Sequence, residues 1–411
     1  GACLLGLLNS IIIAEVKQVL NPTIAFQVGD AINLPIVTLE CKKQEIESLV
    51  EQNISISKAE WDSRETSWDF QQNELVRQGK ESLKEAYEAY EVYWTEQFYI
   101  LHKNEEELNR EFIAIYGLEE ELTPEVPIEQ ITILKDEAPI TDGRLTFNLK
   151  EVMKQLVSYG VGCIMGRYSL DKEGLILASQ GETIADYYNK VGLTEELVKL
   201  QPVADGIVPV LEEESFENDV VKQFETFMEQ SFGTEHLHSN LNYLQRGLGR
   251  STLRDYFVRD FYKDHTQRYQ NRPIYWMLSS PKGAFRVLIY LHRYTPDTLN
   301  EVLNNYLHPY IQRIENEIEL QETNLPSTSG ANRTATIKRI DELKVKLEDC
   351  VIYSKELYDL AVERINLDLD DGVLVNYNKL GNAVEMVREI NGKTKKASVR
   401  KFEWIKADEI R

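Results

Sequence analysis

Basic residues gather in one stretch of this otherwise acidic chain. Between positions 246 and 293 there are ten Lys and Arg residues and three Asp residues, whereas the chain of 411 residues carries a formal net charge of −22. Clustered like charges create a field that attracts anions, and arginine offers a planar fork of donors to a phosphate group. The stretch, here called the basic block, therefore predicts a phosphate-binding surface. Its candidate contacts are Arg246, Arg250, Arg254, Arg259, Lys263, Arg272, Lys282 and Arg286.

The spacing inside the basic block indicates a helix. Arg246, Arg250 and Arg254 fall at i, i+4 and i+8, which predicts one row on one helix face. Such a row could follow successive phosphates of a nucleic acid. The alternative is that these arginines pair with acidic residues elsewhere in the chain, as surface charges commonly do. Composition leaves both readings open.

A glycine-rich segment offers a weaker candidate. Gly160, Gly162 and Gly166 lie in GVGCIMG, which lacks the GxGxxG spacing of a dinucleotide loop and follows a predicted helix, not a strand. We expect these glycines to permit close backbone packing, and we expect no cofactor site in this chain. Arg167, which follows them, could pair with Asp171 or contact a phosphate.

The histidines and aspartates do not predict a metal site. His236 and His238 would face the same way on a strand, but a metal needs a third or fourth ligand and only Glu235 is adjacent. The aspartates of NLDLDDG lack the spacing of a calcium loop. No Ser or Cys nucleophile motif stands out, so we expect no catalytic residue. Residues interpreted as structural or as non-ligating are His265, His292, His308, Asp368, Asp370 and Asp371.

Hydrophobic periodicity predicts a mainly α protein with small β elements, of the α+β class. Helices are expected over 1–20, 39–57, 78–117, 149–158, 297–321 and 334–365. The continuous apolar stripe of 78–117 predicts a long helical spacer. The last two helices, joined by a polar loop, should pack as a long antiparallel helical hairpin.

Extended elements are fewer. Two apolar runs flank Pro281, Lys282 and Gly283, which predicts a β-hairpin within 272–294. Residues 26–37 resemble a short strand, a turn and a second extended piece. Residues 57–70 are predicted to be irregular and to carry three aromatic side chains. The two tryptophans could stack on bases, but we favour their interpretation as buried anchors between helices. The three aromatic side chains are Trp61, Trp68 and Phe70.

Length and composition indicate a soluble protein of two to three domains. Its four cysteines are far apart in sequence, which suits a reducing cytoplasm. The apolar N-terminal run is broken at Asn9 and Ser10, is too short to cross a bilayer, and has no basic segment before it. The chain begins without Met inside a helical pattern, so we expect it to be part of a longer protein.

Several long stretches together resemble a known family. They are NPTIAFQVGDAINLPI (21–36), EWDSRETSWDF (60–70), GCIMGRYSLDKEGL (162–175), NRPIYWMLSSPKGAFRVLIYLHRY (271–294) and LDDGVLVNYNKLG (369–381). In this order they are similar to the C-terminal half of the PglX family, the adenine-specific DNA methyltransferases of bacteriophage-exclusion (BREX) systems.

The resemblance implies S-adenosylmethionine-dependent N6-methylation of adenine at a short DNA site in phage defence. The catalytic loop of that chemistry, Asn/Asp-Pro-Pro-Tyr/Phe, holds the flipped base. This chain has no Pro-Pro dipeptide, so no catalytic residue is transferred and the cofactor is expected only in the parent protein. The implied organisation is the end of a target-recognition domain (1–38), a helical spacer (39–121), an α+β domain with the basic block (122–296), and a helical hairpin with a basic tail (297–411).

Three functions follow as hypotheses. In the first, the chain is a non-catalytic region that clamps double-stranded DNA through the basic block. In the second, it is an assembly module that docks other BREX subunits, phage anti-restriction proteins or the N-terminal methyltransferase domain, and its acidic surface would repel DNA. The third, a coiled-coil adaptor unrelated to DNA, leaves the basic block unexplained. We favour the first.

Overall fold

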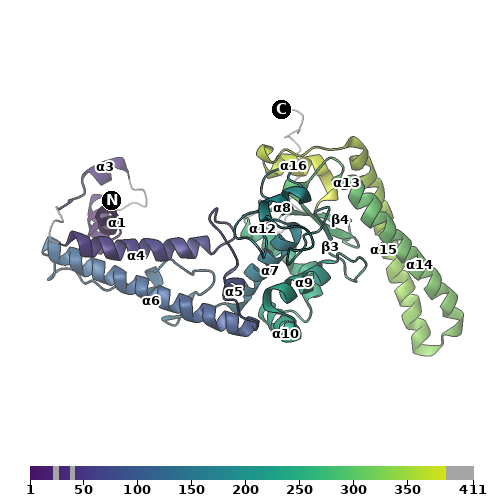
Figure 1. The fold of residues 1–411 in the computed structure, drawn as a ribbon, viewed down its shortest axis with the longest axis horizontal. Helices are drawn as coiled ribbons and strands as arrows, with labels where there is room; N and C mark the ends of the chain where they lie inside the picture. Colours follow the sequence, from purple (N-terminus) through teal and green to yellow (C-terminus); the bar gives the residue numbers. More distant parts are fainter. Residues whose placement is uncertain (22–26, 38–41, 386–411) are drawn as a thin grey trace. The chain divides into compact units, whose positions relative to one another are not determined.

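The computed structural model describes residues 1–21, 27–37 and 42–385 (Figure 1). Their contacts form two compact units. Unit 1 consists of Gly1–Gln78 and Lys84–Val152, and unit 2 of Gly79–Leu83 and the chain from Met153 onward. Residues 122–152, which the sequence assigned to the following domain, thus belong to unit 1 by their contacts. The predicted basic tail lies outside the described residues.

Unit 1 is built on two long helices, α4 (Lys43–Asp62) and α6 (Leu83–Tyr116). The Asn104 amide joins them by donating to Gln52 and Asn53 at 2.8 and 2.9 Å. The short helices α1 (Ala2–Leu8) and α2 (Ile11–Leu20) pack on this pair through a shared apolar core. The stripe predicted for 78–117 is buried throughout, which confirms the spacer helix. Its members are Leu83, Tyr87, Tyr90, Trp94, Phe98, Leu101, Leu108 and Phe112.

Two predictions near the N-terminus are wrong. The helix expected over 1–20 breaks between α1 and α2, where Ser10 has extended backbone angles and its hydroxyl donates to Leu7 O. The strand expected in 26–37 is in part a helix, α3 (Val28–Ile32), which a capping box between Gln27 and Asp30 begins. Within the described residues no single helix is long and apolar enough to span a membrane, and only α1 and α2 together, bent by 58°, reach that length and composition.

The aromatic segment after α4 is placed only partly as expected. Phe70 is buried at 3% exposure, but Trp61 is 57% and Trp68 95% exposed. α4 also runs past the predicted end of its helix, to Asp62. Lys58 then bridges Asp62 and Asp69 at 2.6 and 2.7 Å, closing the turn that carries Trp68. The interpretation of both tryptophans as buried anchors is therefore wrong.

Unit 1 is completed by small elements. These are α5 (Glu74–Arg77), a 3-10 turn at Ile128–Gln130, and a two-stranded sheet of β1 (Ile140–Thr141) and β2 (Arg144–Leu145). Arg64 holds residues 130–140 against α4, because its guanidinium pairs with Glu60 and with Glu137. This side of unit 1 is thus fixed by charged groups that are largely buried.

Unit 2 contains a three-stranded antiparallel sheet in the order β3 (Ile207–Pro209), β5 (Arg286–Tyr290), β4 (Tyr275–Ser279). The predicted hairpin is confirmed, with Tyr275 opposite Tyr290 and Ser279 opposite Arg286. β3 was missed because its three residues are all buried and show no alternation. Apart from the long helical hairpin, the described residues of unit 2 form seven α-helices. They are α7 (Leu149–Met165), α8 (Ile184–Val191), α9 (Val220–Phe232), α10 (Leu237–Leu248), α11 (Leu253–Tyr256), α12 (Tyr262–Arg268) and α16 (Val373–Leu380).

The glycines of α7 have the packing role expected of them. Gly160 and Gly162 lie inside the helix, where a Cβ on either would overlap aromatic rings of Phe224, Phe227 or Tyr168. Gly166 ends the helix with a positive φ of 83°. Close approach of side chains thus explains Gly160 and Gly162, and the positive φ explains Gly166.

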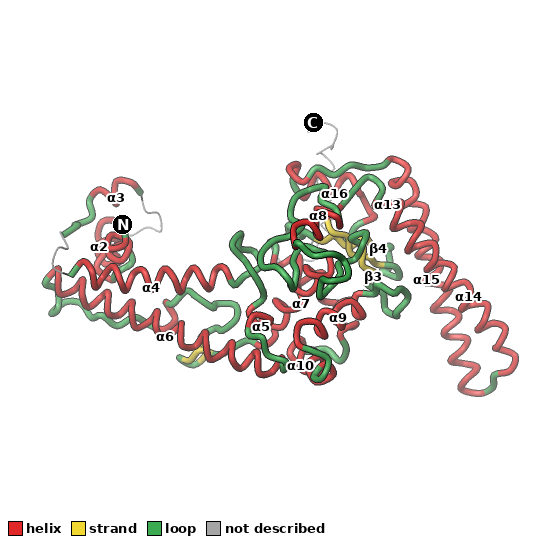
Figure 2. The backbone as a smooth tube through the Cα atoms, viewed as in Figure 1, coloured by secondary structure: helices red, strands yellow, loops and turns green. Residues whose placement is uncertain are grey.

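The long antiparallel helical hairpin is also confirmed (Figure 2). Its first arm runs from α13 (Thr298–Glu301) through a π-helical turn into α14 (His308–Asn324), and its second is α15 (Gly330–Glu363). Arg364 pairs with Asp297 at one end, and Arg339 pairs with Glu317 at 2.7 Å toward the other. The fold is therefore mainly α with small β elements, as predicted.

Candidate nucleic-acid interface

The predicted row of three arginines on one helix does not form. α10 ends at Leu248, because Gly249 adopts a left-handed φ of 70° and caps it. A new helix, α11, begins after Thr252, whose hydroxyl accepts from the Asp255 N–H at 3.1 Å. Arg246, Arg250 and Arg254 thus lie on three different elements. The prediction of one helix face is wrong, although both caps can be read in the sequence Gly-Arg-Ser-Thr-Leu-Arg-Asp.

Arg254 is part of the core of unit 2. Its Nη1 and Nη2 donate to the two carboxylate oxygens of Asp219, each at 2.9 Å, and Nη1 also donates to Leu211 O at 2.9 Å. Asp219 is 0% exposed and also caps α9 by accepting from the Val221 N–H at 3.0 Å. Both ends of the Arg254 guanidinium are thus engaged by a buried carboxylate within the fold.

Four more members of the basic block have acidic partners. Arg250 pairs in bidentate fashion with Asp260, with one contact of 2.8 Å, and this hydrogen bond raises the Arg250 pKa. Arg286 Nη1 donates to Val258 O at 3.0 Å, and its Nε lies 3.3 Å from a Glu385 carboxylate oxygen. The weaker pairs, both on exposed side chains, are Arg259 with Asp255 at 3.7 Å and Lys282 with Glu348 at 3.8 Å.

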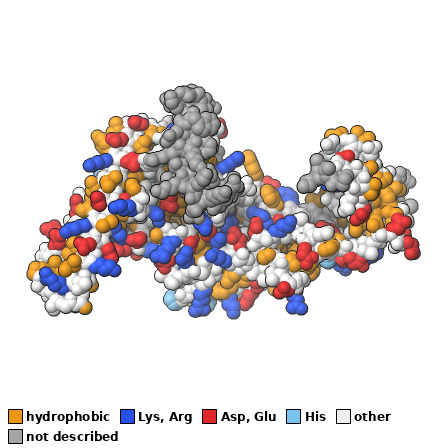
Figure 3. Space-filling view, turned by 180° about the vertical axis from the view of Figure 1, so that it is seen from behind, with side chains coloured by type: hydrophobic (Ala, Val, Ile, Leu, Met, Phe, Trp, Pro, Cys, Tyr) orange, Lys and Arg blue, Asp and Glu red, His pale blue; other side chains and the backbone are white. Residues whose placement is uncertain are grey.

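Three members remain exposed without an ion pair in the part of the chain that the structure describes. Arg246 lies on α10, Lys263 on α12, and Arg272 on the segment that leads into β4. Figure 3 shows Lys and Arg side chains interspersed with Asp and Glu over one face of the molecule. The basic block is therefore not one continuous basic surface, and its unpaired charge comes from few side chains.

The turn of the β-hairpin is held by a buried carboxylate that sequence reasoning missed. Asp349 of α15 is 1% exposed and accepts from Ser280 Oγ at 2.6 Å, Lys282 N at 2.9 Å and Ala284 N at 3.2 Å. It therefore fixes the backbone of Lys282 to the helical hairpin. No local signal marks Asp349, since its partners lie far away in the sequence.

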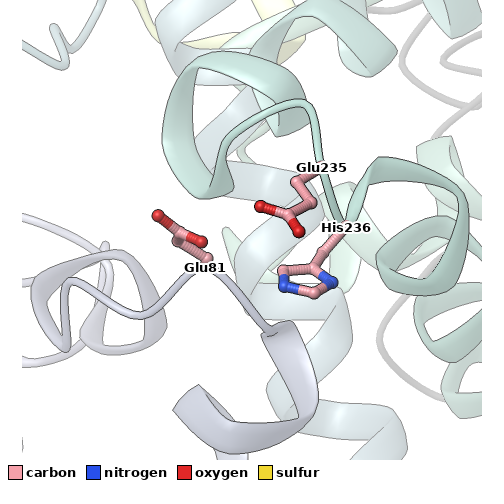
Figure 4. A group of neighbouring side chains, drawn as sticks. All are labelled: Glu81, Glu235 and His236. Carbon is pink, nitrogen blue, oxygen red and sulfur yellow. The ribbon is translucent and has the colours of Figure 1, made fainter.

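His236 does have two carboxylates nearby, one of them unforeseen. One ligand atom from each of Glu81, Glu235 and His236 lies within 4.8 Å of the others. Figure 4 shows Glu235 and His236 on one connection and Glu81 on another segment. The Asn240 amide ties these segments together, because its Nδ2 donates to Glu81 O at 2.8 Å and its Oδ1 accepts from Leu83 N at 2.9 Å. His238 lies on helix α10, not on a strand, and is not in the group.

Arg167 does not pair with Asp171. Asp171 accepts from the backbone N–H of Lys199 at 2.8 Å. Arg167 instead donates from Nε to Tyr168 Oη at 3.1 Å and from Nη1 to Tyr290 Oη at 3.3 Å. The predicted ion pair between Arg167 and Asp171 is therefore wrong.

Comparison with known proteins identifies two relatives that cover nearly the whole chain. The chain is 33% identical over 413 aligned residues, 96% of its length, to "Adenine-specific methyltransferase BrxX" of Escherichia coli O9:H4 (strain HS). It is 33% identical over 393 aligned residues, 91% of its length, to "Adenine-specific methyltransferase PglX" of Lacticaseibacillus casei (strain Zhang). These matches confirm the resemblance that the sequence motifs indicated. No protein-family model matches the chain.

The chain spans about one third of the length of both relatives, 33% of the first and 31% of the second. Most of each relative thus lies outside the region compared.

Proposed function

We propose, because the chain belongs to the PglX family of adenine-specific methyltransferases, that it is a non-catalytic region of a site-specific DNA N6-adenine methyltransferase of BREX phage defence. In this proposal the region helps to hold double-stranded DNA in the cytoplasm while the rest of the polypeptide binds S-adenosylmethionine and the target adenine. The absence of any Pro-Pro dipeptide supports the placement of the catalytic loop elsewhere.

The observation that carries the proposal is the set of exposed basic side chains without an acidic partner among the described residues: Arg246, Lys263 and Arg272. Unpaired Lys and Arg contribute to DNA affinity by releasing counterions from phosphates, whereas paired ones must first break an ion pair. Lys282 and Arg259, whose pairs are long and exposed, are secondary contacts. Arg250, Arg254 and Arg286 then position the block and do not contact DNA. The phosphate contacts proposed for the exposed, unpaired side chains orient the duplex but carry no sequence information.

The test is fluorescence anisotropy of the 411-residue chain with a labelled duplex of about 30 base pairs across a salt series. Three variants are compared: wild type, Arg246/Lys263/Arg272→Ala, and a control with the same charge change at the exposed unit 1 lysines Lys103, Lys135 and Lys150. Each lost phosphate contact reduces the slope of log K against log salt by about 0.9. We expect the first triple variant to lose about 2.7 units of slope and the control to lose none. Equal slopes in both variants, or no binding by wild type at low salt, would refute the clamp.

A second function is favoured by one feature of the helical hairpin. α15 exposes apolar side chains along its length, with Val345 and Ile352 51%, Tyr358 58% and Val362 63% exposed. Apolar side chains repeated along an exposed helix are typical of a protein-docking surface. An assembly role, with other BREX subunits, phage anti-restriction proteins or the methyltransferase domain of the same polypeptide as partners, is the alternative if DNA binding fails.

A further inference from the structure

Arg167 presents a charge that the surrounding protein does not neutralise. It directly follows Gly166, which ends α7, and is partly buried. Its guanidinium lies over the Tyr168 ring, with Cζ 5.5 Å from the ring centroid, and its two hydrogen bonds go to tyrosine hydroxyls. Among the described residues no carboxylate pairs with it. Burying a cation without an anion is costly, so this arrangement calls for an explanation.

Aromatic and imidazole rings form the surroundings of this guanidinium. Tyr290, which accepts from Arg167, lies 5.2 Å from Tyr275 between ring centroids and 5.1 Å from His292. Tyr275 in turn stacks on His265 at 4.8 Å. The rings come from β4, β5, α12 and the residues that follow β5, so the sheet of unit 2 fixes their positions.

The two histidines add buried ring nitrogens but no charge. His265 Nε2 accepts from the Tyr275 N–H at 3.1 Å, so the neutral ring carries its proton on Nδ1. That Nδ1 is buried and has no hydrogen-bond partner, and the same holds for His292 Nδ1. Burial, together with the positive charges of Arg268 and Arg167, lowers the pKa of His265 to about 3, and burial with the charge of Arg167 lowers that of His292 to about 4. Both rings are therefore neutral at pH 7, and a buried donor without an acceptor is destabilising.

We propose that Arg167 is the centre of a binding site for one phosphate-type oxyanion, with His265 Nδ1–H as a neighbouring donor. The guanidinium keeps donors beyond its two tyrosine bonds, and a phosphate accepts several hydrogen bonds at once. An oxyanion neutralises Arg167 without introducing a second fixed charge into the fold. The oxyanion is either free, as inorganic phosphate or the phosphate of a nucleotide, or part of a DNA backbone. The proposal does not rest on the basic block or on DNA binding.

The competing explanation is a structural arginine that the face of Tyr168 stabilises through a cation–π interaction. The two explanations differ in their response to added anions. A structural arginine is indifferent to phosphate at constant ionic strength, whereas a binding site is stabilised by it.

The experiment is a titration of the 411-residue chain with inorganic phosphate at constant ionic strength, with chloride as the matched salt, followed by thermal unfolding and calorimetry. Wild type is compared with Arg167→Gln and with Arg144→Gln, an exposed arginine of β2 in unit 1. We expect phosphate to stabilise wild type and the Arg144 variant, and to bind at least tenfold more weakly to the Arg167 variant. No phosphate response in wild type, or an unchanged response in Arg167→Gln, overturns the proposal.

A second measurement keeps the test decisive if Arg167→Gln does not fold. Wild type labelled with 15N only at histidine reports the Nδ1–H resonance of His265, which phosphate should shift in a saturable manner, and an unaffected resonance counts against the site. Adding duplex DNA distinguishes the sources of the oxyanion. If DNA weakens phosphate binding competitively, the ligand is a backbone phosphate. If phosphate binds equally well with and without DNA, the ligand is a free phosphate or nucleotide.

Discussion

Replacing Arg254 by Ala should destabilise unit 2, although the residue was predicted from sequence to contact DNA. The substitution removes the guanidinium that pairs with the Asp219 carboxylate, which is 0% exposed, together with a hydrogen bond to Leu211 O. Breaking one side of a buried ion pair costs about 3–5 kcal/mol. The Arg254 side chain is itself 22% exposed, so water can enter the space it leaves and the cost should lie near the lower limit, about 3 kcal/mol.

The matched control is Arg259→Ala in the same stretch. The Arg259 side chain is 66% exposed and lies 3.7 Å from Asp255, and such surface pairs contribute about 0–1 kcal/mol. Thermal unfolding followed by circular dichroism at pH 7 should show Tm falling by about 6–12 °C for Arg254→Ala, from about 2–4 °C per kcal/mol in a unit of this size, and by less than about 2 °C for Arg259→Ala. Equal Tm values for the two variants would refute the structural role of Arg254.

A double variant separates the ion pair from side-chain packing. In Arg254→Met/Asp219→Asn both charges are removed, while an amide oxygen remains to cap α9 and a long apolar side chain fills the space of Arg254. This variant should recover at least half of the loss seen for Arg254→Ala, because the uncompensated buried carboxylate is the main cost. No recovery would mean that lost packing, and not charge, explains the destabilisation.

Three further changes have defined outcomes. Asp349→Ala leaves the turn donors Lys282 N and Ala284 N without an acceptor, so their amide hydrogen exchange should accelerate and stability should fall by about 2–4 kcal/mol. Phe70→Ala should cost about 3–5 kcal/mol in urea unfolding and Trp68→Ala less than about 0.5, since the former side chain is 3% and the latter 95% exposed. Because burial holds the pKa of His265 near 3, the unfolded state binds an extra proton below about pH 6.5. His265 should therefore contribute a fall in stability of about 1.4 kcal/mol per pH unit on acidification from pH 6.5 to 4. His265→Gln should remove this contribution to the slope of Tm against pH and leave that of His292, whose pKa is about 4.

The elements with a strong internal period were predictable from sequence. The stripes of α6 and α14 repeat apolar residues at helical spacing and are buried as expected, as Phe98 and Ile314 illustrate. A β-hairpin around Gly283 follows from turn residues between two apolar runs. β3 and the exposure of Trp68 were not predictable, because the former depends on pairing with β5 and the latter on ion pairs of Lys58 that close a turn. The formation of β3 and the exposure of Trp68 therefore depend on contacts within the fold and not on residue type.

In the candidate interface, too, local features were predictable from the sequence and contacts between distant residues were not. Residue type identified the basic block, but it could not show which of its members pair with acids and which three have no such partner among the described residues. Asp219 and Asp260 are 35 and 10 residues from the arginines they bind, and periodicity carries no signal at such separations. The end of α10 after Arg246 could have been predicted from the sequence. Gly249 and Thr252 are local capping residues, and they are stronger evidence for helix ends than the spacing of three arginines is for one continuous helix.

The pairing inside the basic block also limits what a clamp built from it can do. If binding relies on Arg246, Lys263 and Arg272, the salt slope of the region is about −2.7, which is small for a DNA-binding surface. The remaining surface of a chain with net charge −22 opposes a phosphate backbone. The region would therefore orient a duplex that other parts of the polypeptide bind, since three contacts can fix a direction but supply little affinity. An affinity of the isolated chain that is strong at physiological salt would contradict this division of roles.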